Sequence, residues 1–169
     1  MAALVYSPVG VAHAGGAVLA IGSGAWVLLA RKGTAAHVRV GWVYVATMVW
    51  VNASALAIRH LSGGYNFFHV LAVVSLLMVL GGVGQVVYRR HFRRWLWRHY
   101  QYMCWSYAGL LAGAINEACV RLPGLRDFSA STGNWLPVGG SVVVIGAAAA
   151  LIVANQRRLL AQFGATAAG

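Results

Sequence analysis

Apolar residues occur in five long stretches, which are separated by short polar segments that hold most of the charges. The stretches cover residues 9–30, 36–58, 67–88, 100–120 and 136–154. About 20 apolar residues span the hydrocarbon core of a bilayer, and a helix satisfies its own backbone hydrogen bonds there. The pattern therefore predicts an all-α integral membrane protein: one domain of 169 residues with five transmembrane helices.

Composition excludes the other common classes of protein. Hydrophobic residues make up 60% of the chain, charged residues make up 9%, and the mean hydropathy is +0.71. A soluble domain carries roughly a quarter charged residues, and a disordered chain is far less apolar. Arg31 and Lys32 follow the first stretch directly and no cation precedes it, so we expect a membrane span and not a cleavable signal peptide.

The charges are strongly asymmetric, with 13 Lys and Arg against two acids and a net charge of +11. In the predicted topology, 10 cations lie on the side of the first loop, the third loop and the C-terminus. The other side holds 3 cations and both acids, Glu117 and Asp127. We expect the protein to lie in the cytoplasmic membrane. The positive-inside rule then places its N-terminus outside the cell and its C-terminus in the cytoplasm. We expect lipid, and not nucleic acid, as the partner of these cations.

Histidines are the most informative residues of so apolar a chain. His13 and His69 fall near the outer ends of the first and third stretches, and His37 and His99 fall near the inner ends of the second and fourth. We expect the first four helices to form an up-down four-helix bundle with the fifth packed outside, so that each pair lies on diagonal helices. Two such pairs at two depths indicate two haem b groups, each with two axial histidines.

Further side chains suit such a site. The haem propionates need cations or hydrogen-bond donors, and the inner-level candidates are Lys32, Arg39, Arg94 and Arg98, with Arg59, Tyr65 and Asn66 at the outer level. Many small residues in the spans permit either close helix approach or room for a flat ligand.

Helical spacing links the histidines to two more candidates. The second helix carries one stripe of residues at steps of three or four: His37, Gly41, Tyr44, Met48 and Asn52. In the fourth helix, Glu117 follows His99 by five whole turns and shares its face. Glu117 and Tyr44 are therefore candidates for handling protons or for supporting the ligands.

Simpler explanations stay open for several of these residues. Glu117 can form an ordinary ion pair with Arg121 one turn later. Met48 and Met103 are typical of packing between helices. The basic run at 89–94 is explained by its effect on topology and by contact with anionic lipid.

The segments 13–15, 32–44 and 99–107 resemble a family of predicted bacterial membrane proteins, domain of unknown function number 2306. The matching features are a histidine opening the first helix, a basic-Gly…His…Gly…Tyr entry to the second, and a His…Met…Ser-Tyr entry to the fourth. Val38 departs from the family, which has an arginine there. The resemblance implies a helical membrane fold and the positions of the site, but no activity.

The histidine pattern has a looser architectural similarity to cytochrome b561 and related di-haem membrane cytochromes. Those proteins carry histidine pairs on alternating helices of a four-helix core and pass electrons across the membrane. The similarity implies the same pairing here, of His13 with His69 and of His37 with His99. It covers that pattern only, so function has to be argued from the site.

Three classes of function fit these observations, and we favour the first. The first is a transmembrane b-type cytochrome that passes single electrons from a quinol or cytoplasmic reductant to an acceptor at the opposite face; as an enzyme it would be an oxidoreductase. The second is a membrane enzyme that binds Zn, Cu or Fe through an outer cluster of His13, His60, His69 and Glu117. The third is a non-enzymatic carrier or assembly helper, and a homodimer through residues 136–154 fits any of the three.

Overall fold

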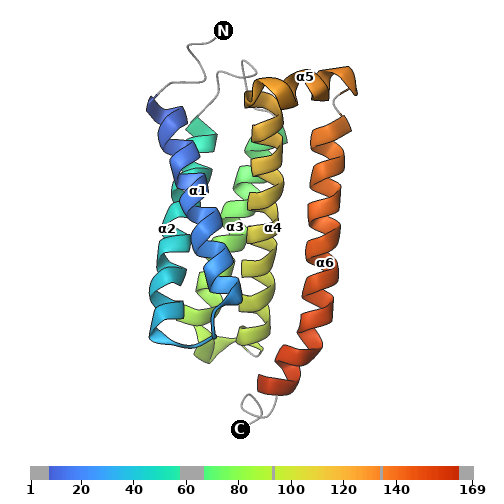
Figure 1. Cartoon of the computed structure of the whole chain (residues 1–169). Helices are drawn as coiled ribbons and strands as arrows, with labels where there is room; N and C mark the ends of the chain where they lie inside the picture. The colour runs from blue at the N-terminus through green and yellow to red at the C-terminus, as the bar shows by residue number, and fades with distance from the viewer. Residues whose placement is uncertain (1–7, 58–66, 93, 134, 164–169) are drawn as a thin grey trace. The chain divides into compact units, whose positions relative to one another are not determined.

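The computed structural model describes residues 8–57, 67–92, 94–133 and 135–163, and this part of the chain is helical with no strand (Figure 1). The elements are α1 (Pro8–Leu29), α2 (Ala35–Ala57), α3 (Phe67–Val87), the 3₁₀ turn η2 (Arg89–His91), α4 (Trp95–Arg121), α5 (Pro123–Ser131) and α6 (Trp135–Phe163). Each of the five predicted stretches corresponds to one long helix of the described residues, so the all-α prediction is confirmed.

Four of the described helices are long and apolar enough to cross a membrane: Pro8–Leu29, Ala35–Ala57, His69–Val87 and Trp135–Gln156. At most 28% of the residues in any of these windows are buried within the protein. So much exposed apolar surface indicates a nonpolar surrounding such as lipid. The fourth predicted span, residues 100–120, lies in α4, which is 27 residues and roughly 40 Å long but is not among these four helices.

Contacts divide the chain into two compact units, Met1–Val79 and Leu80–Gly169, with the boundary inside α3. In the first unit α1 and α2 pack together, and a short turn joins them. Lys32 closes α1, because its ammonium donates hydrogen bonds of 2.6–2.9 Å to the carbonyl oxygens of Val27, Leu28 and Ala30.

The same turn also starts α2. Gly33 has a φ of +76°, a left-handed conformation that glycine adopts without steric cost. Thr34 then acts as the N-cap: its hydroxyl oxygen accepts a hydrogen bond of 3.1 Å from the backbone N–H of His37. The sequence Lys-Gly-Thr therefore ends one helix, reverses the chain and begins the next.

Small residues on α1 permit its close contact with α2. Gly16, Ala20 and Gly24 recur every fourth residue and are all buried. Opposite Gly16 lies the indole of Trp50, whose N–H donates a 3.1 Å hydrogen bond to the carbonyl oxygen of Ala12. Packing and one hydrogen bond from a side chain of α2 to the backbone of α1 thus hold the two helices together.

In the second unit α4 packs against α6, and Figure 1 shows the two running in opposite directions. Asn116 donates a 2.7 Å hydrogen bond to the hydroxyl of Ser141 on α6. A Cβ added at Gly140 would lie 2.9 Å from Ile115, so the backbones approach closely beside this bond. Polar pairing next to a small residue is typical of helices that pack in a nonpolar solvent.

The polar segment between the fourth and fifth stretches is not an irregular loop, because residues 123–131 form α5. Pro123 occupies the first turn, where its missing N–H costs nothing and its fixed φ suits a helix. Gly133, with a φ of +65°, follows the C-terminal end. The helix lies across the ends of α4 and α6 (Figure 1) and exposes Leu125 and Phe128.

The glycine contact between α1 and α2 generates a test with a matched control. A Cβ at Gly16 would lie 2.6 Å from Trp50 Cδ1, whereas a Cβ at the neighbouring Gly15 would meet nothing within 4 Å. Gly16→Ala should therefore lower the free energy of unfolding by about 1–3 kcal/mol. Gly15→Ala should leave it unchanged or raise it by up to roughly 1 kcal/mol, since alanine favours helix. Thermal unfolding in detergent measures both, and equal melting temperatures would contradict the contact.

Candidate functional site

His13 on α1 is tied to α2 through one ring nitrogen. Its Nδ1 lies 2.8 Å from the hydroxyl oxygen of Ser54. The single hydroxyl hydrogen of Ser54 is directed at its own helix, where the carbonyl oxygen of Trp50 lies 2.7 Å away. The hydroxyl must then accept from His13, so Nδ1 carries the proton and Nε2 carries the lone pair.

His99 on α4 has the same tautomer for a simpler reason. Its Nδ1 lies 2.8 Å from the carbonyl oxygen of Gly82 on α3, and a carbonyl can only accept. Gly82 is a place of close approach, since a Cβ there would lie 2.5 Å from the sulfur of Met103. The missing side chain of Gly82 thus lets α4 come near enough for the histidine to reach the backbone.

The other two predicted ligands occupy different surroundings. His69, near the start of α3, is buried with 6% of its surface exposed. His37 lies in the first turn of α2, is partly buried, and follows the Thr34 cap. Next along its helix face, a Cβ at Gly41 would meet nothing within 4 Å, so the space beside the backbone is open one turn from His37. His60 and the outer propionate candidates Arg59, Tyr65 and Asn66 lie outside the described residues.

Of the inner propionate candidates, one is bonded to the backbone of its own unit and the other three are exposed. Lys32 directs its ammonium at the carbonyl oxygens that end α1, a structural role that the sequence analysis missed. Arg39 on α2 and Arg98 on α4 are exposed. Arg94 is exposed too and precedes α4 with a φ of 59°, a left-handed conformation that is rare outside glycine. The two exposed helical arginines are therefore the better-placed cations of this set.

Glu117 forms an ion pair with Arg121, with 2.5 Å between Oε1 and Nε. The simpler explanation of this carboxylate is therefore confirmed, and a proton-handling role stays a prediction. Tyr44 and Met48 are buried, with 2% and 1% of their surfaces exposed, as the stripe on the second helix predicted. Met103 packs on Gly82, so both methionines are in contact with the protein interior.

Within the described ranges, no three His, Cys, Asp or Glu side chains gather closely enough to hold a metal ion. The outer cluster of the second hypothesis includes His60, which is outside those ranges. Haem iron, by contrast, needs only two axial ligands from the protein.

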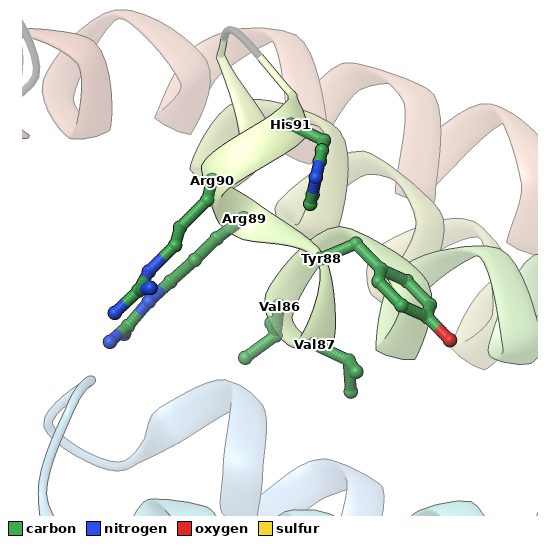
Figure 2. A pocket seen from close by; sticks show the side chains of 6 residues that line it. All are labelled: Val86, Val87, Tyr88, Arg89, Arg90 and His91. Carbon is green, nitrogen blue, oxygen red and sulfur yellow. The ribbon is translucent and has the colours of Figure 1, made fainter.

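Two cavities in the described part of the chain lie away from the four predicted ligands. One of about 380 Å³ lies at the end of α3 and is shown in Figure 2. The other, of about 610 Å³, lies on α6 beside Ala149, Ala150, Val153 and Ala154. The first cavity is lined by basic residues together with two valines and a tyrosine.

No family model, curated protein or solved structure matches this chain. The geometry of the histidines is therefore the main indication of function.

The tautomers of His13 and His99 can be measured directly. In protein labelled with ¹⁵N-histidine and purified without added haem, both neutral rings should carry the proton on Nδ1, because oxygen atoms accept there. In Ser54→Ala, the His13 ring should no longer prefer the tautomer protonated on Nδ1, whereas the tautomer of His99 should stay the same. Exposed His91 serves as the reference for an unconstrained ring. A proton on Nε2 in either anchored ring would contradict the arrangement.

Proposed function

We propose that the chain is a transmembrane b-type cytochrome that passes single electrons between redox partners at the two faces of the cytoplasmic membrane. The observation that carries the proposal is the pair of histidines held through Nδ1. An axial imidazole binds iron through one nitrogen and commonly donates its other N–H to an oxygen atom, which fixes the ring and raises its basicity. His13 and His99 meet that requirement, since each N–H is directed at an oxygen.

The donor set fits haem better than an isolated metal ion. Haem iron accepts two imidazoles, whereas a zinc or copper site needs three or four close ligands. Open space beside Gly41, one turn from His37, offers room for a flat ring. The propionates would be met by Arg39, which is exposed close to His37 on α2, and by Arg98, which is exposed next to His99 on α4. When bound, haem supplies the one-electron chemistry, and the chain's own residues ligate it, orient it and exclude water.

The finer topology belongs to this proposal. It comprises five spans, with α4 as the fourth, a four-helix bundle, an external N-terminus, and the pairing of His13 with His69 and of His37 with His99. The four described apolar helices support the membrane part. We include α4 as a span because its 27 residues are long enough to cross a bilayer. Its polar residues include the proposed ligand His99 and the Glu117–Arg121 ion pair. A quinol is the proposed electron donor.

Absorption spectra test the proposal. Protein expressed in a haem-sufficient host should show a Soret band and, after dithionite reduction, an α-band. His13→Ala and His69→Ala should each remove about half of the haem, and His37→Ala and His99→Ala should remove the other half. His91→Ala, which changes an exposed histidine, should leave the haem content unchanged. A colourless wild-type protein, or equal total loss in all four variants, would contradict two separate sites.

Ser54 is proposed as a positioning residue, acting through His13. Replacing such a partner typically weakens metal binding about 10–100-fold. Ser54→Ala should therefore lower the affinity of one haem and shift its reduction potential, while the second haem keeps its potential. Ser23→Ala is the matched control, because that hydroxyl bonds only to the backbone of its own helix at Leu19 and Ala20. Redox titration with haem quantification distinguishes the two variants, and identical behaviour would remove Ser54 from the proposal.

A further inference from the structure

The end of α3 and the turn that follows it form a small cavity of about 380 Å³. It is lined by six consecutive residues: Val86, Val87, Tyr88, Arg89, Arg90 and His91. Figure 2 shows the side chains of Arg89 and Arg90 extending in the same direction from the turn. Two like charges directed to one side repel each other, so the arrangement is stabilised by an anion between or beside them.

The chain itself does not supply that anion from an acidic side chain. The whole sequence has two acids, and both already have arginine partners. Glu117 pairs with Arg121, and Asp127 lies 3.4 Å from Arg126. No acidic side chain is therefore left to balance the charges of Arg89 and Arg90.

Three of the residues that line the cavity carry aliphatic or aromatic side chains and are exposed. Val87 and Tyr88 each expose 58% of their surfaces, and Val86 exposes 38%. They end a helix that is apolar enough to cross a membrane and stops at Val87. The cavity thus lies where a membrane helix meets the polar headgroup layer, a level at which tyrosine is enriched.

We propose that this cavity binds the headgroup of an anionic phospholipid. The guanidinium groups of Arg89 and Arg90 hold the phosphate, for which the planar arginine fork is well suited. Val86, Val87 and Tyr88 contact the glycerol and upper acyl chain. A free phosphate ion would contact only the two arginines, whereas a phospholipid would also contact the exposed apolar residues. A lipid therefore explains more of the residues that line the cavity. The proposal does not depend on haem.

Lipid titration followed by native mass spectrometry tests it. Lipid-depleted protein in neutral detergent is titrated with phosphatidylglycerol or with phosphatidylcholine. The wild type should bind one phosphatidylglycerol in preference to phosphatidylcholine. Arg89→Gln/Arg90→Gln should weaken phosphatidylglycerol binding about tenfold to thirtyfold. Arg31→Gln/Arg126→Gln removes the same net charge from exposed positions outside the cavity and should change binding little.

Two further arms make the outcome decisive. Arg89→Lys/Arg90→Lys keeps both charges but loses the planar fork, so its affinity should fall between those of the wild type and the glutamine variant. Inorganic phosphate should compete only weakly, because it lacks the apolar part. Equal binding of the two lipids by the wild type would overturn the proposal even if a variant failed to fold. The proposal would also be overturned if the cavity and control variants lost phosphatidylglycerol affinity equally, or if the lysine variant bound phosphatidylglycerol as tightly as the wild type. Displacement of the lipid by stoichiometric phosphate would have the same consequence.

Discussion

In a nonpolar surrounding, polar groups must find their partners within the protein, and this constraint explains most of the structure. Many hydroxyl and amide side chains of the apolar helices bond to a carbonyl one turn earlier in their own helix, as Thr47, Asn52 and Asn155 do. Few polar side chains are left to reach another helix. Those that do, such as His13, His99 and Asn116, mark the places where helices are joined.

Glycine makes these connections possible. At Gly16, Gly82 and Gly140 an added Cβ would lie less than 3 Å from a side chain of a neighbouring helix, and each glycine lies near an interhelical hydrogen bond. Other glycines, such as Gly41 and Gly84, border open space. Close helix approach at small residues is thus confirmed at these three glycines, whereas room for a flat ligand beside the others stays a prediction. Which glycines permit close approach depends on the opposing side chain.

Much of the fold follows from local sequence. The ends of α1, α2 and α3 lie within one residue of the predicted bounds, because apolar length and the Lys32, Gly33 and Thr34 signals act over a few positions. α4 begins at Trp95, five residues earlier than predicted, and α6 continues to Phe163, well beyond the predicted end at 154. Both extensions contain polar residues, which the search for apolar stretches excluded. For the same reason the predicted stretches do not include α5, which is short and amphipathic.

The sequence by itself determined that the chain is helical, that apolar helices dominate it, and that histidines stand at helix ends. Tertiary structure decided what each histidine does with its ring nitrogens. Nothing in the sequence distinguishes Ser54 from other serines in the apolar helices, and the acceptor for His99 is a backbone carbonyl that every residue possesses. Periodicity describes one helix at a time, whereas a hydrogen bond between residues 41 or 17 positions apart depends on how two helices pack.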